Sequence, residues 1–397
     1  MSDFRFTPSP PSSAGFAAEV LQELPTYLDA LVANGDYPGF VTILARGDRL
    51  VLGHANGLHD LESGTPLRPD AIFALKSMSK PFAAVAMMLL HEEGRWALDD
   101  PVSKHLPEFA EIAKLPGSGA TRKPSLGEIF THTAGFAFGK TREEMLAYVK
   151  ALDWSGRRSL TEMTRHYASQ PLSYEPGTDW QYSVATDLQA EIVERATGER
   201  YDVFLKRRVF EPLGMRDTSF VLSAAQSRRL TPGYTVDPTT GRTREIAPGE
   251  MDDPIFAMGG STFKSTALDY ARFARMLLNR GELGGTRVLK PESVDLMLSN
   301  LLSDDFLETR RGILHYVIGQ GNGYAMNGLV CIDPERAGRP VGRGTYEWGG
   351  ALGTWFWIDP ENDLLCVGMT HRQRSMTNMR PPEVVAQEIV YRALKRV

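Results

Sequence analysis

The sequence is most informative over residues 74–82, which read Ala74-Leu75-Lys76-Ser77-Met78-Ser79-Lys80-Pro81-Phe82. Ser77 and Lys80 are three positions apart, so on a helix they share one face, about one turn apart. An amine at that distance can take the proton of a serine hydroxyl and so make the serine a nucleophile. Ser79 lacks such a partner, because the residue three positions after it is Phe82. The spacing therefore makes Ser77 the candidate nucleophile and Lys80 one candidate for the group that takes its proton.

Pro81 helps to place the start of this helix. Proline is tolerated in the first turn of a helix, so the apolar helix expected over residues 81–94 should begin near Ser77. The backbone N–H of Ser77 then lacks an intrahelical partner and can donate to an oxyanion. The helix dipole favours negative charge at the same end. A serine before an apolar helix is also a common cap, so Ser-x-x-Lys alone is a weak signal.

The rest of the chain divides into strand-rich ends and a helical middle. One hairpin is expected around residues 46–48, and a second around residues 360–363, where β-rich runs flank turn residues. Apolar periodicity and proline punctuation predict the helices. These helices are expected at 17–32 (with Pro25 as a kink or a start), 81–94, 141–151, 159–169, 185–197, 201–208, 266–280 and 382–397.

This order predicts an α/β (α+β) fold in which both ends of the chain share one central antiparallel sheet flanked by helices. A mainly helical domain is inserted between the two parts of the sheet. Residues 1–75 and 253–397 are assigned to the sheet domain, and residues 76–252 to the helical domain. A cleft between two such regions is a usual place for a small-molecule site, so the active site is expected there.

Composition narrows the classes of partner. With 397 residues, the chain is long enough for about two domains or one large composite unit. Its net charge is −5 and it has no Lys/Arg-rich run, so no nucleic-acid partner is expected. No stretch approaches the roughly 18 apolar residues of a membrane span. The N-terminal residues lack the pattern of a secretory signal, so a cytoplasmic location is expected, while the oligomeric state stays open.

Several other chemistries lack support in the sequence. Cys331 and Cys366 lie in strand-like segments and are expected to be buried free thiols. The eight histidines show no metal-binding spacing, so no metal or cofactor is expected. A Gly-x-Ser-x-Gly elbow is absent, which argues against an α/β-hydrolase. Residues 259–262 (Gly-Gly-Ser-Thr) fit a turn before a helix, at the cleft, rather than a phosphate loop. The charged segment 301–312 is expected to be a solvated loop or a wall of the cleft.

Four runs of sequence together resemble the serine β-lactamase/penicillin-binding-protein superfamily, in the superfamily's order and over most of the chain. The first is the Ser-x-x-Lys segment itself, which is among the signatures of that superfamily. The others resemble its "L-L-T-H-T-S-G", "P-G … Y-S" and "F-x-P-L-G-M" runs. They read Ile129-Phe130-Thr131-His132-Thr133-Ala134-Gly135, Glu175-Pro176-Gly177 with Tyr182-Ser183, and Phe210-Glu211-Pro212-Leu213-Gly214-Met215.

The resemblance implies a second base. Tyr182 of Tyr182-Ser183-Val184 takes the place of the superfamily's motif tyrosine, although the asparagine of the Tyr-x-Asn form is missing. A phenol acts as a base near neutrality only beside a cation, and Lys80 can be that cation. The two groups would then titrate as a unit, so neither can be singled out as the base. His132, by its place in the second run, is expected to have a structural role.

Where β-lactamases have Lys-Thr-Gly, this chain has Trp348-Gly349-Gly350-Ala351. Trp-Gly-Gly in this place resembles family VIII carboxylesterases, the class C β-lactamase-like esterases of the superfamily. The resemblance implies that Trp348, Gly349 and Gly350 contact the substrate. It also implies that the N–H groups of Ser77 and Ala351 hold the oxyanion.

The sequence therefore predicts a serine carboxylesterase that hydrolyses small, short-chain esters through an acyl-enzyme on Ser77. The alternatives are a β-lactamase or D-Ala peptidase and an alcohol acyltransferase, which would use the same groups. A non-catalytic binding module is disfavoured because the serine, the lysine and the tyrosine are all present.

Overall fold

The computed structural model describes residues 4–136, 159–237, 239–240, 243–247, 255–309, 318–373 and 380–395. Within these residues, nine strands form one sheet in the order β1-β3-β2-β15-β14-β13-β12-β11, and β4 pairs with β3. The pairing of β1 with β3 is parallel, and the other pairings are antiparallel. The strands of this sheet are β1 (Thr7–Pro8), β2 (Gly39–Arg46), β3 (Arg49–Asp60), β4 (Thr65–Pro66), β11 (Asn322–Ala325), β12 (Gly328–Cys331), β13 (Tyr346–Gly349), β14 (Trp355–Asp359) and β15 (Leu364–Met369).

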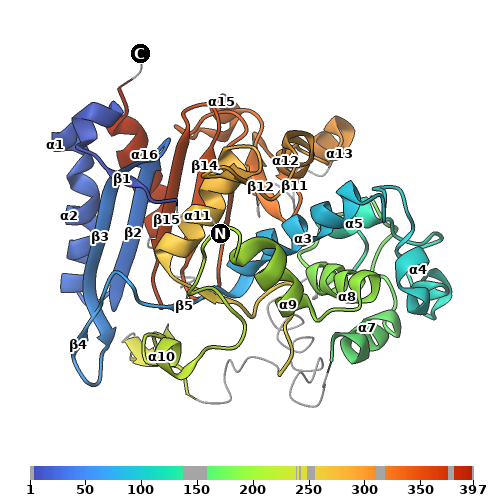
Figure 1. Cartoon of the computed structure of the whole chain (residues 1–397). Coiled ribbons are helices and arrows are strands. Elements are labelled where there is room, and N and C mark those ends of the chain that lie inside the picture. Colours follow the sequence, from blue (N-terminus) through green and yellow to red (C-terminus); the bar gives the residue numbers. More distant parts are fainter. Residues whose placement is uncertain are drawn as a thin grey trace.

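The two ends of the chain meet inside this sheet. Both predicted hairpins are present, β2–β3 and β14–β15, and each turn contains a residue with positive φ, Gly47 in the first and Asp363 in the second. β15 pairs with β2, with Cys366 opposite Leu44, so an early and a late segment are direct neighbours (Figure 1). The predicted fold class, with a central sheet built from both chain ends, is confirmed.

Helices α1 (Ala18–Leu21), α2 (Glu23–Ala33) and α16 (Pro382–Ala393) pack on one face of the sheet (Figure 1). The helix expected over 17–32 is divided at Gln22, and Pro25 lies in the first turn of α2, where a missing N–H costs nothing. The apolar core under these helices includes Cys366 and the stacked rings of Trp355 and Trp357. Cys331 and Cys366 are buried free thiols, as predicted.

The opposite face of the sheet carries α11 (Ala267–Leu278), which contacts β2, β14 and β15. Beside the sheet lie the helices of the middle of the chain, grouped around α3 (Lys80–Glu92), which is buried from Lys80 to Leu90 (Figure 1). These helices are α4 (Val102–His105), α5 (Leu126–Thr131), α7 (Leu160–Ala168), α8 (Ala185–Thr197) and α9 (Tyr201–Leu205). The predicted domain boundaries at 75/76 and 252/253 stay a prediction.

Shorter elements complete the described chain. The remaining helices are α10 (Ala224–Ser227), α12 (Pro291–Leu298), α13 (Asp304–Thr309) and α15 (Pro334–Ala337). The 3-10 turns are η1 (Pro11–Ala14), η2 (Lys76–Ser79), η3 (Pro107–Phe109) and η4 (Ile112–Lys114), and η5 (Lys206–Phe210) is a π-helical turn after α9. Three two-stranded pairs are β5 (Phe73–Ala74) with β8 (Lys264–Ser265), β6 (Tyr234–Val236) with β7 (Thr243–Glu245), and β9 (Glu282–Leu283) with β10 (Thr286–Arg287). Within the described part of the chain, no helix combines the length and the apolarity that a membrane crossing needs.

Two predicted segments are not matched by an observed counterpart. The helix expected at 141–151 lies outside the described residues. The expectation of a solvated loop at 301–312 is wrong for residues 304–309, which form α13, capped where Ser303 Oγ accepts the Phe306 N–H at 3.2 Å. Leu302 and Phe306 are both buried in one apolar cluster with Trp180, whereas Asp304 and Asp305 are exposed, so the helix has one buried side.

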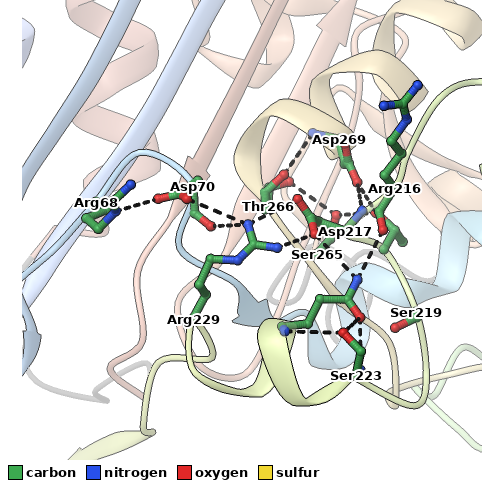
Figure 2. A network of polar contacts seen from close by, with 12 residues as sticks. Arg68, Asp70, Arg216, Asp217, Ser219, Ser223, Arg229, Ser265, Thr266 and Asp269 are labelled. Carbon is green, nitrogen blue, oxygen red and sulfur yellow. Dashed lines mark hydrogen bonds and ion pairs between the residues drawn. The ribbon is translucent and has the colours of Figure 1, made fainter.

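A polar network fixes the start of α11 to the chain that precedes α10 (Figure 2). Asp269, in the first turn of α11, accepts hydrogen bonds from the Asp217 N–H at 2.7 Å and from Thr218 Oγ1 at 3.2 Å. Arg229 pairs with Asp217 and donates to the backbone carbonyl of Asp70 at 3.0 Å. The network therefore joins three separate segments around one buried carboxylate.

Candidate active site

Ser77 lies in the 3-10 turn η2, and α3 begins only at Lys80. The α-helix therefore starts three residues later than the sequence predicts, and a tighter turn takes its place. In a 3-10 turn, residues three positions apart are eclipsed, so Ser77 and Lys80 still share one side. Lys80 Nζ donates a hydrogen bond to Ser77 Oγ at 3.4 Å.

The chain before Ser77 is held between two neighbouring segments. The Leu75 N–H donates to the Phe263 carbonyl at 2.9 Å, next to the β5–β8 pair. On the other side, Thr354 Oγ1 donates to the Leu75 carbonyl at 3.2 Å. A Cβ atom on Gly350 would lie 2.2 Å from the same Leu75 oxygen. Glycine is thus required at 350 because the chain itself approaches there, and this contact places Trp348-Gly349-Gly350 beside the Ser77 turn.

Tyr182 completes the group around the serine. Its Oη–H donates to Ser77 Oγ at 2.9 Å, and Lys80 Nζ lies 4.7 Å from the centre of its ring. Ser77 and Tyr182 are partly exposed, whereas Lys80 is buried. Ser79 is also buried, and its Oγ accepts the Phe263 N–H at 3.3 Å. The three residues predicted as catalytic therefore lie together, and Ser79 is engaged elsewhere.

His132 holds the segment that carries Tyr182. It ends α5 with a positive φ of 58°, and its carbonyl accepts the Gln181 N–H at 3.1 Å. Its Nδ1 accepts the Ser183 N–H at 3.2 Å, and its ring centre lies 4.7 Å from that of Tyr182. Burial, with the charge of Lys80 acting in the same direction, lowers the pKa of His132 well below its usual value. The neutral ring is the form that accepts at Nδ1, so His132 fixes both neighbours of Tyr182.

Trp348 forms an aromatic wall beside these groups. The centre of its ring lies 5.8 Å from that of Tyr182 and 5.5 Å from that of Tyr324. Tyr324 in turn packs edge-on against Trp180, and Phe306 of α13 belongs to the same cluster. This wall offers an apolar surface beside Tyr182.

Ala351 follows in an exposed turn between β13 and β14. This turn is closed by a hydrogen bond of 2.7 Å from the Gly350 N–H to the Thr354 carbonyl. The turn thereby lies next to η2 through the contact of Gly350 with Leu75. The assignment of the Ser77 and Ala351 N–H groups as oxyanion donors stays a prediction, as does substrate contact by Trp348 and its two glycines.

Asp187 is a further member of this site that the sequence analysis missed. It is buried in the first turn of α8, and its Oδ1 accepts the Gly260 N–H at 3.0 Å. The carbonyl of Gly260 accepts from Lys80 Nζ at 2.9 Å. Burial raises the pKa of Asp187 to about 6, against the opposing effects of Lys80, the Gly260 N–H and the Tyr167 hydroxyl. No local pattern sets Asp187 apart, because Thr186, Gln189 and Glu191 of the same helix are also polar.

The residues described here give no sign of a metal centre, since no group of three or more His, Cys, Asp or Glu side chains is placed to bind one. The site instead consists of a hydroxyl, an amine, a phenol and a buried carboxylate. Such groups can move a proton and form a covalent bond to a carbonyl carbon.

An antiparallel sheet flanked by helices, with Ser-x-x-Lys where the sheet meets a helical block, defines the class of serine hydrolases with a β-lactamase-like fold. The model of the beta-lactamase family matches residues 24–389, and the chain belongs to this family. It is 34% identical to protein Rv1367c of Mycobacterium tuberculosis over 342 residues, which cover 82% of this chain and 84% of that protein.

Two further relatives are informative. The chain is 32% identical to esterase EstB of Burkholderia gladioli over 362 residues, covering 86% of this chain and 88% of EstB. Among solved structures, EstCE1, "a hydrolase with promiscuous acyltransferase activity", has the same fold, with a TM-score of 0.77 and 24% identity over 94% of this chain and 99% of that one. The predicted superfamily and fold, and the prediction of an enzyme of this hydrolase class, are confirmed.

Proposed function

We propose that the enzyme is a serine carboxylesterase that hydrolyses small, short-chain esters through an acyl-enzyme on Ser77. The observation that carries this proposal is the approach of two proton-transfer groups to one hydroxyl. Tyr182 Oη lies 2.9 Å and Lys80 Nζ 3.4 Å from Ser77 Oγ. The 32% identity to EstB, which is named an esterase, supports the same reaction.

In the first half of the reaction, Ser77 Oγ forms a bond to the carbonyl carbon of the ester. Its proton passes to the Tyr182–Lys80 pair, both of whose polar atoms lie within hydrogen-bond distance of Ser77 Oγ. The negative carbonyl oxygen is held by the Ser77 and Ala351 N–H groups. The C–O bond to the alcohol then breaks, and the departing oxygen takes the proton from the pair.

In the second half, a water molecule attacks the acyl carbon while the same pair accepts a proton from it. The bond from the acyl carbon to Ser77 Oγ breaks, the carboxylic acid leaves, and the proton returns to Oγ. Each half thus uses the pair first as a base and then as an acid, as microscopic reversibility requires.

Trp348 is the reason to prefer esters over lactams. Penicillin-type substrates carry a carboxylate, which the lysine of the β-lactamase motif helps to bind. An indole cannot replace that charged contact, whose loss typically costs a few kcal/mol, or roughly a hundredfold in specificity. The Tyr182-Ser183-Val184 run also lacks the asparagine amide that could bond to a substrate's amide side chain.

The test compares kcat/KM for p-nitrophenyl acetate and butyrate with that for nitrocefin, on one preparation, with Ser77→Ala as the matched control. We expect clear, Ser77-dependent hydrolysis of both esters and slow or no hydrolysis of nitrocefin. If nitrocefin is the better substrate, the esterase assignment is wrong.

Acyl transfer to an alcohol is the second candidate reaction. The shared fold with EstCE1 favours it, because that protein is described as having promiscuous acyltransferase activity. An alcohol would replace water in the second half of the same mechanism. Product analysis with added short-chain alcohols measures it, since a new ester forms only if the alcohol competes with water for the acyl group.

A further inference from the structure

Lys80 is held by the backbone of a glycine as well as by Ser77. Its Nζ donates to the Gly260 carbonyl at 2.9 Å, which is shorter than its 3.4 Å bond to Ser77 Oγ. The N–H of the same glycine donates to Asp187 Oδ1 at 3.0 Å. The backbone of Gly260 therefore lies between the ammonium group and the carboxylate.

The space around Gly260 is closed. A Cβ atom there would lie 3.1 Å from Lys80 Nζ and 3.2 Å from Asp187 Oδ1. The preceding Gly259 is packed still more tightly, because a Cβ atom would lie 2.0 Å from the Thr186 carbonyl oxygen. The Gly259-Gly260 turn is thus seated directly on the first turn of α8, and its position depends on the residues there.

Asp187 is itself firmly placed. Its side chain is buried, and Oδ2 accepts a hydrogen bond of 3.2 Å from the Tyr167 hydroxyl of α7. A buried carboxylate is costly unless hydrogen bonds and an opposite charge compensate it. Lys80 is the cation that favours its ionised form. Since Asp187 follows Tyr182 by five positions, the start of α8 is close to both members of the proposed base pair.

We propose that Asp187 is a positioning residue for acyl transfer. It holds the Gly259-Gly260 turn so that the Gly260 carbonyl keeps Lys80 Nζ within reach of Ser77 Oγ. The inference rests on the proposed function, since it concerns the same proton-transfer pair. Asp187 acts through Gly260 and through its charge, and it is not itself a catalytic residue.

Two substitutions separate these contributions. Asp187→Ala removes both the acceptor for the Gly260 N–H and the charge that faces Lys80. We expect kcat to fall about 10- to 100-fold with KM changed less than about twofold, because a displacement near 1 Å has effects of that size. Asp187→Asn keeps an oxygen for the Gly260 N–H, so it should recover part of the loss yet stay at least about threefold below wild type.

Glu191→Ala is the matched control on the same helix. Glu191 lies one turn further along α8, is also buried, and accepts from Thr161 Oγ1 at 2.8 Å and from Arg195 Nε at 2.7 Å. Its removal breaks a partly buried polar network without touching Gly260. This variant should lower the Tm but leave kcat within about twofold of wild type.

The experiment measures kcat and KM for p-nitrophenyl butyrate, and Tm, for wild type and the three variants. It also measures the rate at which a fluorophosphonate labels Ser77. The proposal predicts parallel losses of kcat and of labelling rate in Asp187→Ala, partial recovery in Asp187→Asn, and neither loss in Glu191→Ala. A folded Asp187→Ala with kcat and labelling within twofold of wild type would overturn it, and so would an equal kcat loss in Glu191→Ala. If Asp187→Ala does not fold, wild-type kcat and labelling in Asp187→Asn overturn the proposal.

The labelling rate separates this inference from the proposed function, because labelling needs an activated serine but no ester turnover. If esters are not hydrolysed while labelling of Ser77 still depends on Asp187, the function is wrong and the positioning role stands. If esters are hydrolysed through Ser77 and the rate of labelling does not depend on Asp187, the positioning role is wrong.

Discussion

Tyr182 Oη donates a hydrogen bond of 2.9 Å to Ser77 Oγ, although 105 positions separate the two residues in the sequence. The bond depends on two sets of contacts, one that holds Ser77 and one that holds Tyr182. Ser77 is held by contacts of Leu75 with Phe263 and Thr354, and Tyr182 by contacts of both its neighbours with His132. The strand-rich part of the chain and the helical part thereby each fix one side of the site.

The proposed sharing of one proton between Lys80 and Tyr182 makes a prediction about combined substitutions. General-base catalysis contributes about 10²–10⁴-fold, so Lys80→Ala and Tyr182→Phe should each reduce kcat/KM for p-nitrophenyl butyrate by that order. The double variant should lose much less than the product of the two losses, because the groups act as a unit. Multiplicative losses in this double-mutant cycle would show independent action and would rule out the shared base.

Gly350 should tolerate no side chain. A Cβ atom would lie 2.2 Å from the Leu75 carbonyl oxygen and 2.4 Å from Thr354 Oγ1, so Gly350→Ala must displace the chain before Ser77. We expect a loss of about 1–3 kcal/mol in the free energy of unfolding and reduced kcat/KM. Gly53→Ala in β3 is the control, since the nearest atom to its Cβ is 3.8 Å away, and it should leave both quantities nearly unchanged. Equal behaviour of the two variants in urea unfolding would contradict the close approach.

Asp269 should make stability depend on pH in a defined direction. Burial raises its pKa from 3.8 to about 6, against the opposing effects of the hydrogen bond from the Asp217 N–H and of the charge of Arg272. A raised native pKa stabilises the fold at pH below 4, and this contribution is lost as pH rises through about 6. In Asp269→Asn that loss is absent, so the stability of the variant relative to wild type should rise by about 2 kcal/mol between pH 4 and pH 7.

Urea unfolding of wild type and Asp269→Asn across this pH range measures the effect. The carboxyl of Asp187, whose pKa is also raised to about 6, is present in both proteins, so the comparison removes its contribution. Substitution of the exposed Asp305 by asparagine is the control and should leave the pH dependence as in wild type. Identical pH dependence in wild type and Asp269→Asn would show that folding does not raise the pKa of Asp269, the buried acid of the network in Figure 2.

The sequence predicted the fold and the reacting groups where the signal is local. Spacing alone places Ser77 beside Lys80, because three positions bring side chains together in an α-helix and in a 3-10 turn alike. Because this spacing cannot distinguish an α-helix from a 3-10 turn, the sequence analysis put the start of α3 three residues too early. Tyr182 was found only through the resemblance to a family, since no local pattern ties it to residue 77.

The contacts that hold the catalytic residues in place could not be predicted from the sequence, because they join residues that are far apart in the chain. Asp187 contacts Lys80 only by way of Gly260, and residues 259–262 were predicted as a turn at the cleft without this contact. The need for glycine at 350 likewise comes from Leu75, which is remote in the sequence. Residues 301–312 were expected, from their charge, to be a solvated loop or a wall of the cleft, and the charge gave no sign of the helix at 304–309, in which Phe306 is buried.

The most direct test of the central claim is to identify the residue that a fluorophosphonate probe modifies, by mass spectrometry of the digested protein. The account predicts a single label on Ser77, complete loss of labelling and of p-nitrophenyl butyrate hydrolysis in Ser77→Ala, and retention of much of both in Ser79→Ala. A label on Ser79, or a Ser77→Ala variant that still hydrolyses the ester at the wild-type rate, would contradict it.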